Sequence, residues 1–118
     1  MNRSAMDLSA ALERIDGDRD LFLTLAEMFI ERSAQDLAAI QQAVLVQDAA
    51  NLAKQAHKLK GLAMEFCAQE AVAAAKQLEE TARQLDLGDA AALCQRVEAE
   101  LMRLTGELQE IIAKGFPS

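Results

Sequence analysis

The sequence contains no tryptophan, no tyrosine, four phenylalanines and a single proline, Pro117, next to its last residue. Alanine and leucine dominate instead, with frequent Glu and Gln. Proline is the residue that most disrupts a helix interior, and the abundant residues are strong helix formers, so the composition predicts an all-α fold. At 118 residues, we expect one domain, residues 1–118, that buries a core without disulfide or metal staples.

Positive charge is also scarce: 12 Lys and Arg face 19 Asp and Glu, for a net charge of −7. Nucleic acids and anionic membranes require a basic face, so neither is an expected partner. The apolar runs are too short to span a bilayer, and the opening residues lack a charged-then-apolar pattern, so we expect no membrane span and no leader. Two cysteines, Cys67 and Cys94, favour free thiols in a reducing compartment. We therefore expect a cytoplasmic monomer.

The residue types that build metal and nucleotide sites are few as well. One histidine and two cysteines lie without the spacing of metal ligands, so no metal is expected. No Gly-rich phosphate loop is present, which excludes a self-sufficient kinase. The acidic residues suggest a solvated helix surface without a paired-carboxylate site. We expect no bound cofactor and no enzyme.

Turn and capping residues divide the chain into helices. We expect a short first helix over residues 7–15, ended by Gly17, and a second helix capped by Asp18. A third helix follows its cap at Asp48 and ends near Phe66. The predicted apolar stripe of the second helix consists of Leu21, Leu25, Met28, Phe29, Leu37, Ile40 and Val44.

The fourth helix is expected over residues 70–87, with Gly88 as its C′ residue and Asp89 as the cap of the last helix. Four amphipathic helices joined by short connections predict an antiparallel up-down-up-down four-helix bundle, with the short extra N-terminal helix across one end. The positions expected to be buried in these two helices are Val72, Ala75, Leu78, Ala82, Leu85, Leu93, Val97, Leu101, Leu104, Leu108, Ile111 and Ile112.

His57, the only histidine, projects opposite to the core stripe of the third helix when residues are placed at about 100° intervals. That stripe comprises Leu52, Leu59, Ala63 and Phe66. Lys54 and Lys60 lie about 60° to either side of His57, and Gly61 follows one turn on. The imidazole is therefore expected to be exposed and flanked by ammonium groups. The outer face is completed by Ala50, Ala53 and Met64.

Three interpretations fit this face. His57 could be an ordinary surface residue among solvated lysines, or the small residues around it could form a second buried seam. Alternatively, the neutral imidazole is a nucleophile and the ammonium groups stabilise an anion bound to it. A glycine inside a helix costs about 1 kcal/mol relative to alanine, and clearing space beside the ring explains Gly61. The third interpretation suits a phosphoryl group carried on nitrogen.

The stretch His57-Lys58-Leu59-Lys60-Gly61, followed by Ala68, resembles the H-x-L-K-G…G-A motif of histidine-containing phosphotransfer (HPt) domains. The opening residues 7–29 are similar to the family's opening, and Leu78-Glu79 falls where its fourth-helix L-E pair lies. The resemblance covers about residues 7 to 108. The chain departs from the family at Cys67, which replaces the second glycine, and at Leu62 and Ala63, where small polar residues are frequent.

The resemblance implies a four-helix bundle in which His57 accepts a phosphoryl group from a receiver-domain aspartate and passes it to another receiver. It assigns Lys60 to positive-charge support and Gly61 to access, and from its place on the other flank of His57 we expect Lys54 to share the charge support. Receiver docking is expected at Ala53, Lys58 and Met64.

The expected partners are response-regulator receiver domains and a hybrid sensor histidine kinase, with Mg²⁺ bound by the receiver. Two other functions remain open: the histidine-phosphorylated domain of a chemotaxis-type kinase, whose donor is ATP, and a receiver-binding bundle that transfers nothing.

Overall fold

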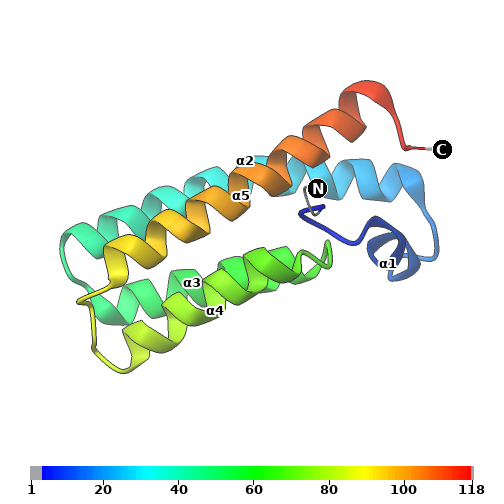
Figure 1. Cartoon of the computed structure of the whole chain (residues 1–118). Helices are drawn as coiled ribbons and strands as arrows, with labels where there is room; N and C mark the ends of the chain where they lie inside the picture. Colours follow the sequence, from blue (N-terminus) through cyan, green and yellow to red (C-terminus); the bar gives the residue numbers. More distant parts are fainter. Residues whose placement is uncertain (1–3, 118) are drawn as a thin grey trace.

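The computed structural model describes residues 4–117, so residues 1–3 and 118 of the expected domain lie outside the described residues. It contains five helices within that range: α1 (Leu8–Glu13), α2 (Arg19–Leu45), α3 (Ala49–Met64), α4 (Gln69–Arg83) and α5 (Ala90–Lys114). Each of α2, α3 and α4 packs against the helix that follows it, and α5 also packs against α2 (Figure 1). The predicted all-α, up-down-up-down bundle is confirmed.

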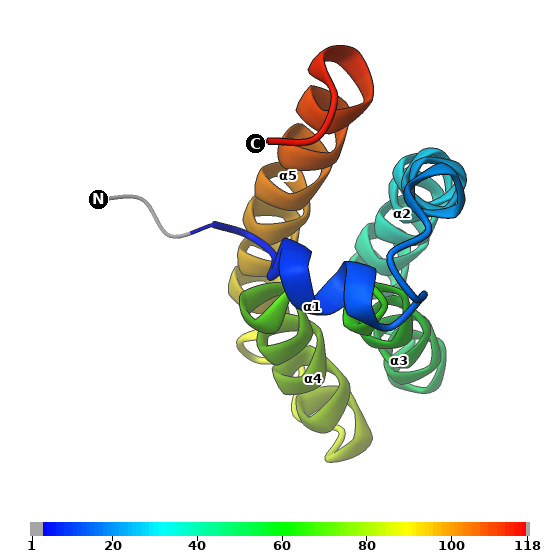
Figure 2. The same ribbon diagram turned by 90° about the vertical axis from the view of Figure 1, so that its right-hand side faces the viewer.

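The two long helices, α2 and α5, extend past α3 and α4 at one end, and α1 lies across that end in front of α3 and α4 (Figure 2). All four phenylalanines are found in this region. Phe66 makes edge contacts with Phe22 and Phe29, and Phe22 also contacts Phe116 beyond α5. This aromatic cluster stabilises the end of the bundle by burying apolar surface and by edge-to-face contacts between the rings.

Three aspartates cap helix starts: Asp18 and Asp48 as the sequence predicts, and Asp7, which was expected inside the first helix. Asp7, Asp18 and Asp48 each accept a hydrogen bond from the backbone N–H three residues later, at 3.0 to 3.1 Å. Each bond satisfies one of the orphan donors at a helix start. The predicted core stripe of α3 is buried as well, because Leu52, Leu59, Ala63 and Phe66 are each at most 1% exposed.

The predicted end of the fourth helix is wrong. α4 ends at Arg83, and Leu85 rather than Gly88 takes the left-handed conformation, with φ of 58°. The turn closes by a hydrogen bond from Asp86 N to Thr81 O, which leaves Leu85 77% exposed instead of buried. Ending the helix here allows Ala90 to be buried at the start of α5. Asp89 precedes α5 as predicted, but its side chain makes no capping hydrogen bond.

The core stripe of α2 is shifted from the predicted one. Leu21 and Met28 are 42% and 53% exposed, whereas the neighbouring Phe22 is 1% exposed. The buried stripe also includes the polar residues Ser33 and Asp36, a pattern that hydrophobicity alone does not reveal. The full buried set in α2 is Phe22, Ala26, Phe29, Ser33, Asp36, Ile40 and Ala43.

The α3–α4 turn, where Cys67 replaces a glycine of the resembled motif, forms with Cys67 in the left-handed region at φ of 51°. Ala68 N donates to Ala63 O across the turn, and the carbonyl of Cys67 accepts from Asp7 N at 3.1 Å. A non-glycine residue in this region costs about 1 to 2 kcal/mol, so the geometry explains why glycine suits the position. Cys67 is half-buried, while Cys94 is buried in α5 and burial raises the pKa of its thiol.

Candidate functional site

His57 lies on the outer face of α3, and its side chain is 60% exposed. The prediction that it points away from the core is confirmed. The ring is nevertheless not free, because its Nδ1 lies 2.8 Å from Oε2 of Glu79 on α4. An exposed histidine anchored through one nitrogen differs from an ordinary surface residue.

Glu79 is 4% exposed and gathers three neighbours around its carboxylate. Lys60 Nζ donates to Oε1 at 2.8 Å, and Arg83 donates to Oε2 from Nε at 3.1 Å and from Nη2 at 2.7 Å. We call His57, Lys60, Glu79 and Arg83 the Glu79 cluster. Its buried carboxylate contradicts the expectation that the acidic residues form only solvated surface.

The carboxyl group of Glu79 is ionised because its partners outweigh its burial. Burial by itself raises the pKa of Glu79, but the hydrogen bonds from Lys60, Arg83 and His57 lower it, and so does the nearby Lys60 charge. The result is a pKa of about 2, below the ordinary value of 4.5. Near neutral pH the carboxylate therefore carries a full negative charge.

An ionised carboxylate only accepts hydrogen bonds, so Nδ1 of His57 donates to Glu79. In the neutral ring the other nitrogen, Nε2, then carries no proton and keeps its lone pair. The two nitrogens flank Cε1 and their in-plane bonds diverge, so a ring held at Nδ1 has its Nε2 lone pair directed away from Glu79. This arrangement presents a neutral nitrogen nucleophile to an incoming group.

The three predicted lysines have different environments. Lys60 is 22% exposed and bound to Glu79, so it is not the free flanking charge that helical projection suggests. Lys54 and Lys58 are exposed. Neither lysine has an ion pair within the described part of the chain. The cations joined to His57 through Glu79 are therefore Lys60 and Arg83.

Gly61 lies in open space: apart from its chain neighbours and the backbone of its own helix, no atom lies within 4 Å of the position that a Cβ would occupy. Met64 is 48% exposed, so the alternative of a buried seam fails for both residues. Ala53, in contrast, is only 9% exposed and belongs to the buried stripe beside Leu52. Its side chain offers little surface to a partner, contrary to the expected docking role. Packing does not require a glycine at position 61, and the access role of Gly61 stays a prediction.

Gly61 variants separate access from packing. We expect Gly61→Ala to fit and to raise the unfolding free energy by up to about 1 kcal/mol, because alanine is the better helix former. Gly61→Glu should slow phosphoryl transfer at least tenfold, because its side chain crowds the ring and repels an anion. The transfer rate is measured from quenched time courses with one phosphorylated receiver.

Gly106 offers a matched control for this prediction, because it also lies within a helix, α5, with no atom within 4 Å of its Cβ position. Gly106→Glu makes the same change in charge and size away from His57. Equal transfer rates for the two glutamate variants would refute the access role.

Glu79 and Arg83 are the cluster members that the sequence reasoning missed. Two signals were available. Glu79 follows Leu78 and lies four residues after Ala75, so it borders the buried stripe of α4. Arg83 follows Glu79 by four residues, a spacing that places opposite charges next to each other on a helix.

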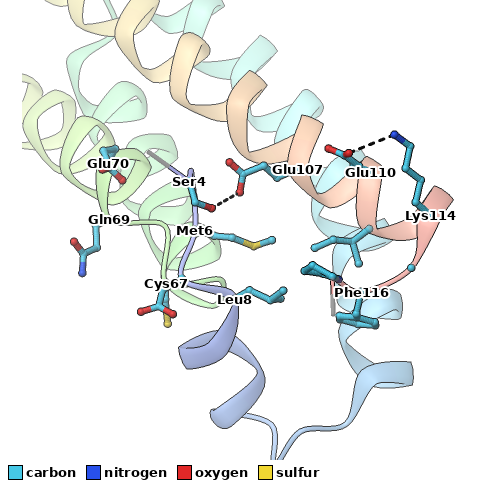
Figure 3. Close-up of a pocket in the computed structure, with 14 residues that line it drawn as sticks. Ser4, Met6, Leu8, Cys67, Gln69, Glu70, Glu107, Glu110, Lys114 and Phe116 are labelled. Atoms are coloured by element: carbon cyan, nitrogen blue, oxygen red, sulfur yellow. Dashed lines mark hydrogen bonds and ion pairs between the residues drawn. The ribbon is translucent and has the colours of Figure 1, made fainter. Parts of the chain in front are cut away.

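A separate cavity of about 1000 Å³ lies near the α1 end, between the N-terminal segment and the end of α5 (Figure 3). Ser4 and Glu107 are hydrogen-bonded at its wall, and none of the Glu79 cluster lines it.

Among residues 4–117, no group of three or more His, Cys, Asp or Glu side chains is placed to hold a metal ion. None of α1 to α5 has both the length and the apolar character that crossing a bilayer requires. The histidine face thus remains the better candidate site.

The family model of the Hpt domain matches residues 24–114, a range that includes the whole Glu79 cluster. The chain belongs to the Hpt domain family. As an Hpt domain it is a histidine phosphotransfer protein of phosphorelay signalling, and its family consists of phosphocarriers that interact with receiver domains.

A solved structure resembles this Hpt domain in fold: the crystal structure of histidine-containing phosphotransfer protein B (HptB) from Pseudomonas aeruginosa PAO1. The TM-score is 0.89, and the likeness covers 96% of this chain and 98% of that chain at 24% sequence identity. No curated protein sequence matches the chain.

Proposed function

We propose that His57 of this Hpt domain accepts a phosphoryl group on Nε2 from the phosphoaspartate of a response-regulator receiver domain and passes it to a second receiver. The observation that carries the proposal is the Glu79 contact at Nδ1, 2.8 Å long, on a ring whose side chain is 60% exposed. This contact leaves Nε2 as the accessible nucleophile.

The transfer step follows from this geometry. The Nε2 lone pair attacks phosphorus and forms a P–N bond, while the P–O bond of the acyl phosphate breaks and its electron pair returns to the receiver's carboxylate. The imidazole becomes positively charged as the bond forms, and its Nδ1 proton faces the ionised Glu79. Glu79 therefore stabilises the charge that develops on the ring. The reverse step returns the phosphoryl group to a second aspartate.

Other residues of this face support the negatively charged phosphoryl group and the receiver that delivers it. Lys60, and Lys54 more remotely, offset the negative charge of the phosphoryl group, and Gly61 leaves room for it. We assign receiver docking to the exposed Lys58 and Met64. The Mg²⁺ and most of the catalysis belong to the receiver, so this chain acts as a carrier without kinase activity of its own.

In this scheme a hybrid sensor histidine kinase supplies the first phosphorylated receiver, and the chain works as a monomer in the cytoplasm. The Hpt family membership supports receivers as partners. A monomer suits the scheme because each transfer pairs one imidazole with one receiver pocket.

Phosphotransfer profiling tests the proposal. Receiver domains from the source organism are phosphorylated on aspartate and mixed one at a time with this protein. We expect a subset to donate rapidly, giving acid-labile, base-stable label on this chain, and a second receiver to accept that label. Label that arrives only from a kinase with ATP would favour the chemotaxis-type alternative, and receiver binding without any label would favour the non-transferring bundle.

A further inference from the structure

Arg83 is joined to the ring of His57 through a single oxygen atom. Oε2 of Glu79 accepts from Arg83 Nη2 at 2.7 Å and lies 2.8 Å from His57 Nδ1. The guanidinium and the imidazole are therefore separated by no more than two hydrogen-bond lengths. Lys60 is bound to the other carboxylate oxygen, Oε1, at 2.8 Å.

The charges of the Glu79 cluster do not cancel. One carboxylate faces two permanent cations, Lys60 and Arg83, so the cluster has one positive charge in excess while His57 is neutral. Glu79 requires compensation because it is buried, and Lys60, whose side chain is 22% exposed, is the cation enclosed with it. The excess charge therefore lies with the more exposed cation.

That cation is Arg83, whose side chain is 61% exposed. Its Nε and Nη2 are bound to Glu79, and its Nη1 has no hydrogen bond within the described residues. A guanidinium is planar and can bind two phosphoryl oxygens at once, which an ammonium cannot. Its side chain is long and flexible, so the guanidinium can exchange its hydrogen bonds with the carboxylate for bonds to an anion on the neighbouring ring.

Building on the proposed phosphotransfer function, we infer that Arg83 is a phosphate-binding residue: when Nε2 of His57 carries a phosphoryl group, the guanidinium binds its oxygens while Lys60 continues to hold Glu79. The two cations thus have separate tasks. Lys60 compensates the buried carboxylate, and Arg83 stabilises the phosphohistidine. This assignment refines the proposed function, in which Lys60 and Lys54 offset the phosphoryl charge through space: Arg83 is the cation that binds the phosphoryl oxygens directly.

The test uses phosphohistidine made chemically, so it depends on no partner. In the reaction with phosphoramidate, Nε2 forms the new P–N bond, the original P–N bond breaks, and the nitrogen leaves as ammonia. The second ionisation of the phosphoryl group is then followed by ³¹P NMR against pH in wild type, Arg83→Gln and Arg83→Lys. Arg96→Gln is the matched control, because it removes the same charge from an exposed arginine whose hydrogen bond among residues 4–117 is to Gln77.

We expect Arg83→Gln to raise the pKa of the phosphoryl group, because the dianion loses its nearby cation, while Arg96→Gln leaves it at the wild-type value. Arg83→Lys should fall between the two. Against one phosphorylated receiver, Arg83→Gln should move the transfer equilibrium about three- to tenfold toward the receiver, and added salt should reduce the shift.

The inference is overturned if Arg83→Gln and Arg96→Gln give the same phosphoryl titration and the same transfer equilibrium. It is also overturned if Arg83→Gln changes the His57 ring signals only before phosphorylation, since Arg83 would then act solely through Glu79. The proposed function fails separately, if wild-type protein takes label from no receiver, and the chemically phosphorylated protein still decides the role of Arg83.

Discussion

His57→Gln should abolish phosphoryl acceptance from every phosphorylated receiver, because the chain contains no second imidazole. The fold should survive. The side chain is 60% exposed and makes one hydrogen bond, to Glu79, so its loss should lower the unfolding free energy by about 1 kcal/mol or less. Circular dichroism and urea denaturation check the fold, and labelled phosphoryl transfer checks the acceptance.

Lys58→Gln is a suitable companion, because it changes the next residue on the same exposed face and leaves the ring in place. It should accept label, at a reduced rate if Lys58 helps to dock the receiver. Label on folded His57→Gln protein at the wild-type rate would show that another residue carries the phosphoryl group.

Glu79→Gln should be the most damaging substitution that leaves the nucleophile in place. The ionised Glu79 has a pKa of about 2 instead of 4.5, a difference worth about 3 kcal/mol of stability at neutral pH. Because the pKa is depressed in the folded state, this contribution is present above about pH 4.5 and is lost as the pH falls toward 2. The gap in unfolding free energy between wild type and Glu79→Gln should therefore close over that interval.

Transfer should also slow, because a neutral amide no longer dictates which nitrogen of His57 keeps its proton. We expect a loss of about tenfold to a hundredfold in the transfer rate, by analogy with the partners that orient metal-bound histidines. Glu80→Gln is the matched control: it removes the same charge one residue away, from a side chain that is 56% exposed. Urea denaturation at pH 7, 4 and 2.5 and transfer kinetics at pH 7 give both readouts.

If Glu79→Gln loses no more stability than Glu80→Gln at pH 7, the compensated carboxylate is not a source of stability. If the two variants transfer at equal rates, the contact at Nδ1 does not prepare His57 for attack.

Much of the site's location could be predicted from the sequence. Short-range chemistry places helix starts, and Asp18 and Asp48 cap their helices as expected. The single histidine lies opposite a clear apolar stripe, so its exposure follows from helical periodicity alone. The sequence also singles out Gly61 as a candidate site residue, because a glycine within a helix is unfavourable by propensity alone.

The partners of His57 could not be predicted in this way, because they depend on how two helices face each other. Glu79 is buried against α3 only after α3 and α4 pack together, and single-sequence patterns assign acidic residues to the surface. The predicted end of the fourth helix, near Leu85, was wrong for a similar reason. Local chemistry favours Gly88, but closing the bundle places a leucine in the left-handed region at φ of 58°.

Nitrogen-15 NMR of the His57 ring tests the central claim most directly, because the claim concerns one nitrogen of one ring. In the unphosphorylated protein, when the His57 ring is neutral, we predict a protonated Nδ1 and an unprotonated Nε2. After phosphorylation we predict phosphorus–nitrogen coupling at Nε2, with the Nδ1 proton retained against Glu79. A proton on Nε2 in the neutral ring, or phosphorus bonded to Nδ1, would contradict the account.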